Sequence, residues 1–315
     1  MARHNPIVGP FPQSTDWHEA RHRLLTATDT PAILGCVKDR DALSVWAVKT
    51  GRMQPFKGNE YTRRGQRFEA AIAGEYEEAT GHRLSGPMSL YIHPELSYLG
   101  ATPDYQRTET PWGVECKWTT SPDRIRELGE QHTDCVPDDW MLQVQHQIEV
   151  MGWDGADLAC MAYGKLRTFS IPRNDRLIDV ILKACAEMKQ RIDNDDAPEP
   201  TWESPHTVDV LKEIHDTKEG VTVLSGEATV WWQEYQRLGD EAKDCETRRK
   251  AMLARVLDAI GDHAIASLPG GTREVAIHHV ADSVWTAEEI EKLQPGAVKR
   301  RGHVRVQERK ARRGK

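Results

Sequence analysis

Apolar side chains in the first eighty residues recur at the spacing of helices. This periodicity predicts helices over 17–25, 41–50 and 61–79, and the polar cluster from Thr26 to Asp29 is expected to cap a further short helix through Ile33 and Leu34. In the longest of these helices the apolar stripe consists of Phe68, Ala71, Ile72 and Tyr76. Gly81 follows it, as is common where helices end.

The period then changes to that of strands. Residues 88–92, 96–101 and 112–117 predict strands separated by turns rich in Pro, Gly and Thr. A helix over 140–151, a hairpin of 156–163 with 166–171 around Gly164-Lys165, and a helix from a cap at Asn174 to about residue 192 follow. This order predicts an α+β fold, in which helices flank a mixed central sheet in an α/β/α arrangement.

The expected domains are an α+β domain over 1–193, a Pro- and acid-rich linker over 194–225, an extension over 226–297 and a basic tail over 298–315. The extension contains one long helix over 227–260 and a second hairpin of 263–268 with 273–280. A lone helix cannot bury its own apolar face. The long helix must therefore pack on the first domain, fold back or meet a partner chain.

Charge is distributed unevenly along the chain. The tail over 298–315 holds nine Lys or Arg residues against one acid, so its net charge is +8. Because the whole chain has a net charge of −7, residues 1–297 carry −15. This asymmetry is compatible with a polyanion partner, although a basic end is often simply solvated. The sequence lacks a membrane-spanning apolar run, a signal-peptide core and paired cysteines, which predicts a soluble protein in a reduced, cytosolic setting.

Three residues on two predicted strands carry the most specific chemistry. Glu115 and Lys117 are two positions apart, so their side chains share one face of a strand, and Asp104 follows the preceding strand. An exposed ion pair is the plain alternative and would contribute under about 1 kcal/mol. Two adjacent carboxylates, however, are unfavourable unless a cation neutralises them. The set therefore favours a divalent-metal site beside a lysine, which suits phosphodiester hydrolysis.

Helix residues extend this set. Glu69 lies among arginines near the start of its helix, where a surface ion pair is the alternative. Gln143 and Gln145 lie on a helix with an apolar stripe, and an inward-facing amide needs partners such as the lysine.

Together these motifs resemble those of the phage-type alkaline exonucleases, that is lambda exonuclease and the YqaJ-type viral recombinases of the PD-(D/E)xK nuclease superfamily. The resemblance covers about residues 17–192. It rests on Trp17-His18 with Arg21, Thr26 to Asp29, Gly65-x-x-x-Glu69, Thr102-Pro103-Asp104, Glu115-Cys116-Lys117 and Gln143-Val144-Gln145. It implies the restriction-endonuclease-like nuclease fold.

The resemblance also implies residue roles. Asp104, Glu115, the main-chain carbonyl of Cys116 and Glu69 would hold metal, with two Mg²⁺ ions per site and Mn²⁺ as a substitute. Lys117 would orient or deprotonate the attacking water, with Gln143 and Gln145 in support and Trp140 where the family often has an aromatic. Arg21 and Thr28 would bind the 5′-phosphate of DNA, with Thr in place of the expected Ser. A lysine acting in this way would benefit from a lowered pKa, so activity is expected to rise toward alkaline pH.

The expected function is therefore a Mg²⁺-dependent 5′→3′ exonuclease that digests linear double-stranded DNA and leaves 3′ single-stranded overhangs for phage-type homologous recombination. An endonuclease of the same superfamily and an inactive nuclease-fold protein that binds DNA or a partner are the alternatives. The resemblance further implies a homo-oligomer, such as a trimeric ring, a single-strand annealing protein as partner, and the cytoplasm of a bacterial host as location. No membrane association is expected.

Overall fold

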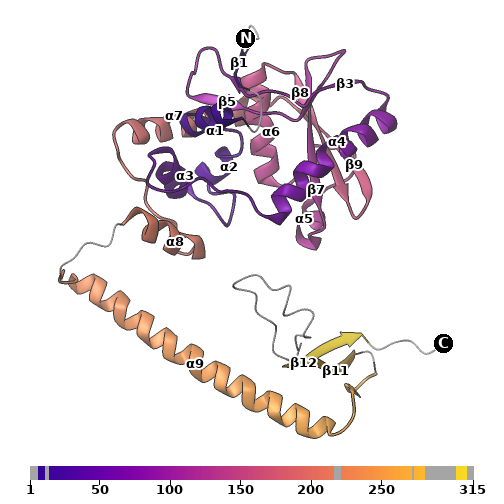
Figure 1. The fold of residues 1–315 in the computed structure, drawn as a ribbon, viewed down its shortest axis with the longest axis vertical. Helices are drawn as coiled ribbons and strands as arrows, with labels where there is room; N and C mark the ends of the chain where they lie inside the picture. Colours follow the sequence, from indigo (N-terminus) through magenta and orange to yellow (C-terminus); the bar gives the residue numbers. More distant parts are fainter. Residues whose placement is uncertain (1–5, 11–13, 216–220, 272, 281–302, 311–315) are drawn as a thin grey trace, which may run out of the picture. The chain divides into compact units, whose positions relative to one another are not determined.

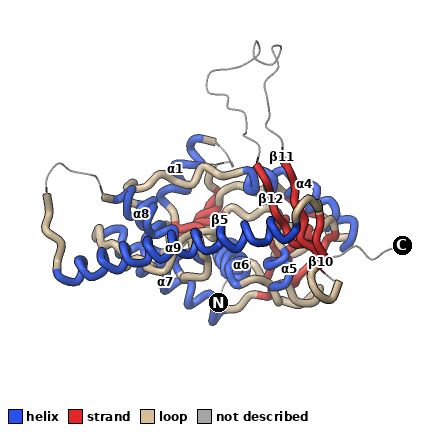
Figure 2. The backbone as a smooth tube through the Cα atoms, turned by 90° about the horizontal axis from the view of Figure 1, so that it is seen from below, coloured by secondary structure: helices blue, strands red, loops and turns tan. Residues whose placement is uncertain are grey.

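The structure is a computed structural model that describes residues 6–10, 14–215, 221–271, 273–280 and 303–310, with only the backbone described at 205, 278–280 and 303–310. The chain divides into two compact units, Met1–Lys218 and Glu219–Lys315. Figure 1 shows the elements of each unit in chain order. Figure 2 shows the same backbone by element type.

The first unit mixes helices and strands. Its helices are α1 (Thr15–Arg23), α2 (Thr30–Ile33), α3 (Ala42–Lys49), α4 (Glu60–Thr80), α5 (Pro122–Glu127), α6 (Asp138–Met151), α7 (Asp175–Asp193) and α8 (Pro205–Ile214). Its strands are β1 (Ile7–Val8), β2 (Leu25–Thr26), β3 (Leu84–Ser85), β4 (Tyr91–Ile92), β5 (Leu99–Ala101), β6 (Tyr105–Arg107), β7 (Trp112–Thr119), β8 (Gly155–Ala162) and β9 (Lys165–Pro172). The α+β prediction is confirmed.

The main sheet has the order β3-β6-β7-β8-β9. The strands β7 and β8 are parallel, whereas the other neighbouring pairs are antiparallel, so the sheet is mixed as expected. Val114 and Cys116 of β7 pack with Ile72 and Tyr76 of α4 in one apolar cluster. Alternate residues of β8, among them Leu158, pack in another cluster with Val144 and Ile148 of α6. Because successive strand residues face opposite sides, α4 and α6 cover opposite faces.

A smaller sheet in the same unit has the order β1-β4-β5-β2. Its strands β2 and β5 are parallel, with Leu25 opposite Leu99 and Thr26 opposite Gly100. The loop after β2 carries Thr28 and the loop after β5 carries Asp104. The carboxyl ends of two parallel neighbours lie at the same sheet edge, so this small sheet brings the two loops to that edge.

Local sequence signals account for several helix boundaries. The side chain of Asn59 caps α4 by accepting from the Thr62 N–H, and Gly81 ends that helix in the left-handed conformation with φ of 76°. The predicted cap at Asn174 is confirmed, because its side chain accepts from the Leu177 N–H. Asp29 precedes α2, but its side chain forms no capping bond there.

Two parts of the first unit differ from the prediction. The expected linker over 194–225 contains α8, whose Val210 is buried in the core with residues of α3 and α7. Phe68 was expected in the buried stripe of α4, but it is 42% exposed and stacks on Trp118 with ring centroids 5.4 Å apart. Ile72 and Tyr76 of the same stripe are buried as expected.

The second unit consists of one long helix and a small antiparallel sheet. The helix α9 spans Gly226–Ile260, close to its predicted bounds, and is uninterrupted (Figure 2). The sheet contains β10 (Ile265–Ser267), β11 (Arg273–Val280) and β12 (His303–Lys310). The predicted hairpin corresponds to β10 and β11. The expected basic tail over 298–315 is in part strand β12, paired with β11, while 298–302 and 311–315 lie outside the described residues.

Within the described part of the chain, none of the helices combines the length and apolar character that a membrane crossing requires.

Candidate active site

The strand β7 places Glu115 and Lys117 on the sheet face that α6 covers. Lys117 Nζ donates hydrogen bonds to Glu115 Oε1 over 2.7 Å and to Gln143 Oε1 over 2.8 Å. Gln143 Nε2 in turn donates to Glu115 Oε1 over 2.5 Å. The three side chains form a closed triangle of hydrogen bonds, which fixes the lysine relative to the carboxylate.

The second oxygen of Glu115 is held by a residue that sequence reasoning missed. Gln147 Nε2 donates to Glu115 Oε2 over 2.8 Å, and both side chains are almost fully buried, at 2% and 3% exposure. Gln143 and Gln147 are one helical turn apart on α6, so they face the same direction. The i,i+4 spacing of the two glutamines was the signal that could have identified Gln147.

Asp104 lies in the loop between β5 and β6, opposite the middle of β7. Its Oδ2 accepts a hydrogen bond from the backbone N–H of Cys116 over 2.8 Å. Burial raises the pKa of this carboxyl group well above its ordinary value, and the negative charges of Glu115 and Glu69 raise it further. Asp104 is therefore adjacent to β7 and held in a strongly anionic environment.

Glu69 of α4 belongs to the same electrostatic environment. Its pKa is raised by burial first and by the Glu115 carboxylate second, while Lys117 lowers it. We call Asp104, Glu115, Lys117, Glu69 and Gln143 the central cluster. Sequence reasoning expected these five residues to meet, and the structure brings them together.

The charge state of Lys117 differs from the expectation. Burial disfavours its ammonium form, but the carboxylates of Glu115 and Asp104 outweigh that effect, so the pKa of Lys117 is raised rather than lowered. A lowered pKa would require neighbouring cations, or burial without acidic neighbours. Because the neighbours of Lys117 are carboxylates, which stabilise its ammonium form, Lys117 is positively charged at neutral pH.

The central cluster has the chemistry of a cation site but not a complete set of ligands. Mutual repulsion among its carboxylates is the condition that a bound divalent cation relieves, and oxygen ligands suit Mg²⁺. Both oxygens of Glu115 are already hydrogen-bonded to Lys117, Gln143 and Gln147. Among the described residues, no group of three or more His, Cys, Asp or Glu side chains is arranged to hold a metal ion. The donor types fit a divalent cation, and Asp104 and Glu69 are the carboxylates without a lysine contact.

An aromatic side chain borders the cluster as the sequence suggested. The buried ring of Trp140 lies with its centroid 6.0 Å from Lys117 Nζ and 5.2 Å from Arg124 Cζ. Arg124 is also paired with Asp139. Trp140 is therefore within cation–π distance of both cations.

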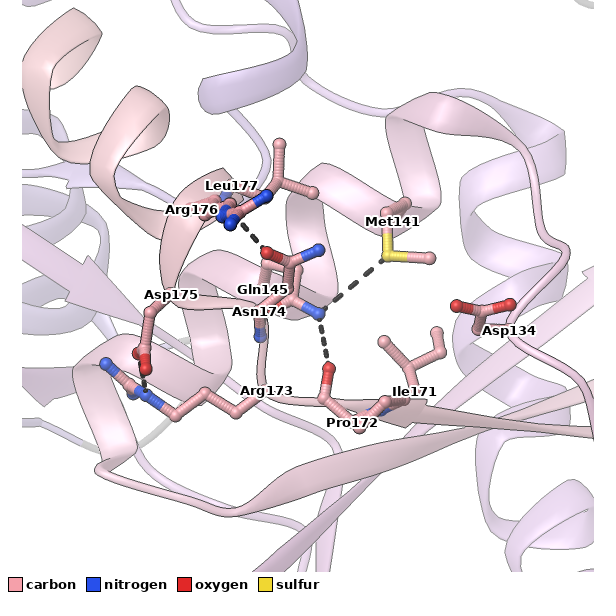
Figure 3. A pocket seen from close by; sticks show the side chains of 10 residues that line it. All are labelled: Asp134, Met141, Gln145, Ile171, Pro172, Arg173, Asn174, Asp175, Arg176 and Leu177. Carbon is pink, nitrogen blue, oxygen red and sulfur yellow. Dashed lines mark hydrogen bonds and ion pairs between the residues drawn. The ribbon is translucent and has the colours of Figure 1, made fainter.

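Gln145 lies away from the central cluster. Figure 3 shows its amide in a pocket of about 350 Å³ between β9 and the start of α7. Gln145 Nε2 donates to the Pro172 carbonyl over 2.8 Å, and its Oε1 accepts from the Asn174 N–H over 2.9 Å. The expectation that Gln145 supports the lysine is wrong, because two positions along a helix point in nearly opposite directions.

The Arg21 and Thr28 side chains meet at a second site. Arg21 Nη2 donates to Thr28 Oγ1 over 2.9 Å, and the guanidinium lies over the Trp17 ring at 4.8 Å. Thr26 Oγ1 is 3.1 Å from Thr28 Oγ1. Arg21 and Thr28, which the resemblance assigns to binding of the 5′-phosphate, are thus in contact although they are seven residues apart in the chain.

A buried carboxylate organises the cations around this pair. Asp29 accepts from the Thr26 N–H and hydroxyl and forms ion pairs with Arg40 and Lys49 at 2.7 and 2.9 Å. Burial disfavours its charge, but Lys49 and Arg40 hold the pKa of Asp29 well below its usual range. Lys49 Nζ also donates to the Arg21 carbonyl over 3.0 Å. Three cations surround one carboxylate, so the Arg21 site carries a net positive charge.

Sequence comparisons relate part of the chain to known proteins. Residues 16–154 match the model of the YqaJ-like viral recombinase domain. The protein YqaJ of Bacillus subtilis (strain 168), described as uncharacterized, is 29% identical over 173 residues, which are 54% of this chain and 53% of that protein. The chain thus spans about half the length of the curated relative it matches.

Two solved structures are similar at lower identity. The alkaline exonuclease of Laribacter hongkongensis has a TM-score of 0.49 and 18% identity, covering 58% of this chain and 94% of that one. A phage-related exonuclease of Haemophilus somnus 129PT has a TM-score of 0.42 and 15% identity, covering 54% and 94%. Such scores do not by themselves assign an activity. The finding that relates this chain to a known family is therefore the match of residues 16–154 to the YqaJ-like viral recombinase domain.

Proposed function

We propose that the central cluster is the catalytic centre of a DNA exonuclease. The enzyme would digest linear double-stranded DNA from its 5′ ends and leave 3′ single-stranded overhangs for phage-type homologous recombination in the bacterial cytoplasm. The observation that supports this most is the triangle of Lys117, Glu115 and Gln143 beside the buried carboxylate of Asp104. A fixed ammonium group can stabilise negative charge on the phosphodiester, and neighbouring carboxylates can hold a divalent cation, so the combination suits hydrolysis of a phosphodiester.

Lys117 acts through its positive charge in this proposal. Because its pKa is raised, Nζ keeps its protons at neutral pH and can donate hydrogen bonds to a water or to a phosphate oxygen. Glu115 and Gln143 restrict the direction in which Nζ points, so the donor is preorganised. Lys117 therefore orients the attacking water and stabilises charge that develops on the phosphate, rather than serving as a neutral base.

Divalent metal belongs to the same proposal. Asp104, Glu115, Glu69 and the main-chain carbonyl of Cys116 would hold Mg²⁺, with two ions per site and Mn²⁺ as a substitute. The ions, when bound, supply an activated water and neutralise charge on the diester. The raised pKa values of Asp104 and Glu69 support this assignment, since burial and the neighbouring carboxylates raise both pKa values more than Lys117 lowers them.

The Arg21 site would recognise the 5′-phosphate of a DNA end. Arg21 offers a guanidinium, and Thr26 and Thr28 offer hydroxyl groups, next to Arg40. A phosphate accepts hydrogen bonds from such donors and is attracted by the positive surplus. The parallel pairing of β2 with β5 brings this site and the Asp104 loop to the same sheet edge, as capture of one end and cleavage near it require.

Residues 1–193 would form the exonuclease domain, and the segment 194–225 adds to it the packed helix α8. Residues 226–297 and the basic 298–315 would serve assembly or contact with DNA. A homo-oligomer and a single-strand annealing protein as partner are carried over from the resemblance.

The test uses linear duplex DNA labelled at either the 5′ or the 3′ end, each with and without a 5′-phosphate, in Mg²⁺ beside a closed circle. We expect early release of the 5′ label from phosphorylated ends and an intact circle. Cutting of the circle would replace the proposal with an endonuclease. Binding of the duplex without any cleavage would replace it with a DNA-binding protein of the nuclease fold.

A further inference from the structure

The long helix α9 presents large apolar side chains to solvent. Trp231 is 61% exposed and Tyr235 is 69% exposed, and the rings of Trp232 and Tyr235 stack with centroids 5.4 Å apart. Over 35 residues, only Ile260 is buried. A helix of this length extends about 52 Å. Exposed apolar side chains gathered on one long element are typical of an interaction surface.

These side chains follow the spacing of a coiled coil. Residues that follow one another at alternating intervals of four and three positions form a line along one side of the helix, which is called the seam of a coiled coil. From Trp231 onward, this seam consists of Trp231, Tyr235, Leu238, Ala242, Cys245, Arg249, Met252, Val256 and Ala259. Only Arg249 interrupts the apolar seam. A seam at an average spacing of 3.5 residues packs against another helix that carries the same repeat. We call these nine residues the α9 seam.

One flank of the α9 seam divides by charge. The position just before each alternate seam residue, the g position of the repeat, is occupied by Glu234, Glu241, Arg248 and Arg255. Acids occupy the first half and bases the second half. The whole helix follows the same division, because residues 226–246 carry −4 and residues 247–260 carry +3.

We propose that α9 pairs in antiparallel orientation with α9 of a second copy of this chain. An antiparallel pair centred near Asp244 brings Glu234 toward Arg255 of the second copy and Glu241 toward Arg248, each twice by symmetry. Opposite charges then meet at every one of these g positions.

The opposite flank agrees with the same alignment. It places Trp232 near Leu253 of the second copy, so two apolar side chains that are exposed on the single helix meet each other. Along the seam, Tyr235 meets Met252 and Trp231 meets Val256. Trp232 and Leu253, which lie on this flank outside the seam, are thereby covered as well.

A parallel pair fits the sequence less well. In a parallel coiled coil a g position meets the residue five positions further along the second helix. Glu241 would then face Glu246, and Glu234 would face Gly239, so charge would be repelled or left without a partner. The charge pattern therefore selects the antiparallel pair. The intrahelical pairs of Arg237 with Glu234 and Glu241 do not oppose it, because exposed pairs of this kind are weak.

Charge reversal in the full chain tests this pairing. Light scattering of the unmodified chain should give about twice the 35.7 kDa mass of one chain. The double variant Glu234→Arg/Glu241→Arg and the double variant Arg248→Glu/Arg255→Glu each place like charges opposite each other. Each should dissociate at concentrations roughly 10- to 100-fold higher than the unmodified chain does. A mixture of the two variants should pair again, and so should the quadruple variant that exchanges both sets.

The matched control is Asp240→Arg/Asp244→Arg, which changes net charge by the same amount on the outer face of α9. It should keep the dimer, and circular dichroism should show unchanged helix content in every variant. A monomeric unmodified chain would overturn the proposal. A dimer that Glu241→Arg strengthens would also overturn it, because removing the Glu241–Glu246 repulsion favours the parallel pair. This pairing is independent of any nuclease activity.

Discussion

Gln147 donates a hydrogen bond to Glu115 Oε2 from the buried side of the central cluster, over 2.8 Å. Glu115 Oε1 meanwhile accepts from Lys117 and Gln143. The carboxylate is thus held at both oxygens, and only one of its three partners is charged. Such hydrogen bonds fix the orientation of a carboxylate in a buried place.

Replacing Gln147 with Ala should therefore leave Glu115 Oε2 without a partner. We expect the free energy of unfolding to fall by about 1–3 kcal/mol and cleavage of linear duplex DNA to fall roughly 10- to 100-fold. Urea unfolding and a rate assay measure the two effects. Gln190→Ala, on the exposed face of α7, is the control and should change neither. Full activity of the Gln147 variant would show that Glu115 needs no support from α6.

Part of the central cluster was predictable from the spacing of its residues along the chain. Glu115 and Lys117 are two positions apart and so share one face of a strand, and Asp104 lies in the loop between two strands. The glutamines were harder, since the motif contains Gln143 and Gln145 while the cluster uses Gln143 and Gln147. Which face of α6 meets the sheet depends on tertiary packing, which a short motif does not encode.

The raised pKa of Asp104 leads to a prediction on metal binding. An ionised carboxylate held against Glu115 and Glu69 destabilises the folded chain at neutral pH, so Asp104→Asn should raise the melting temperature in the absence of divalent ions. Mg²⁺ should raise the melting temperature of the unmodified chain and have much less effect on the variant. Differential scanning calorimetry with and without Mg²⁺ measures both. Equal Mg²⁺ effects on the two proteins would contradict the role of Asp104.

Arg21 is expected to carry the preference for phosphorylated ends. A charged hydrogen bond contributes about 1.5–3 kcal/mol, so Arg21→Ala should reduce the rate ratio between 5′-phosphorylated and 5′-hydroxyl duplexes roughly 10- to 100-fold. The ratio is measured with paired substrates that differ only in that group. Arg23→Ala, exposed on the same helix, should keep the ratio of the unmodified chain. An unchanged ratio in the Arg21 variant would show that this site does not recognise the 5′-phosphate.

The buried, neutral ring of His146 is expected to make the folded protein less stable in acid. Its Nδ1 lies 2.7 Å from Thr30 Oγ1 and its Nε2 lies 3.1 Å from the Gly100 carbonyl, so the neutral ring donates from Nε2 and accepts at Nδ1. Burial lowers the pKa of His146 to about 4. As pH falls, the histidine therefore takes up a proton in the unfolded chain before it does so in the folded chain. The contribution of His146 to the free energy of unfolding is thus unchanged above about pH 6.5 and decreases progressively toward pH 4.

The expected size of this loss is roughly 3 kcal/mol at most. His146→Gln keeps a donor and an acceptor without a titrating group, so it should lose less stability than the unmodified chain between pH 7 and pH 4. Urea unfolding at both pH values gives the difference. Parallel losses in the two proteins would show that His146 does not titrate on unfolding.

A network remote from the central cluster holds α4 in place. The Asp157 carboxylate of β8 accepts from the Tyr76 hydroxyl, from Arg107 and, over 3.0 Å, from Trp112 Nε1. Tyr76 lies two turns beyond Glu69 on α4. We expect Tyr76→Phe to lower the free energy of unfolding by about 1–2 kcal/mol and to slow cleavage through displacement of Glu69. Tyr61→Phe, exposed on the same helix, should leave both unchanged within error.

The long elements of the fold were predictable, whereas only some of the short ones were, such as α2, β4 and β5. Periodicity identified α4, α6, α7, α9, β7, β8 and β9, because each contains enough residues to show its period. Strands such as β2 and β6, of two and three residues, have no such signal. The helix α8 was hidden by a proline at its start, which reads as a linker although proline is favoured there. Pairing of β12 with β11 joins segments far apart in the chain, and local patterns do not show it.

The most direct measurement is the cleavage rate of 5′-phosphorylated linear duplex DNA in Mg²⁺ by the unmodified chain and by Lys117→Met. Methionine keeps most of the length of the side chain but removes the charge that Glu115 and Gln143 orient. We predict a loss of at least about 1,000-fold in rate, with DNA binding retained and the melting temperature within a few degrees of the unmodified chain. A variant that digests the duplex within about tenfold of the unmodified rate would contradict the assignment of Lys117, and with it the central cluster as the catalytic centre.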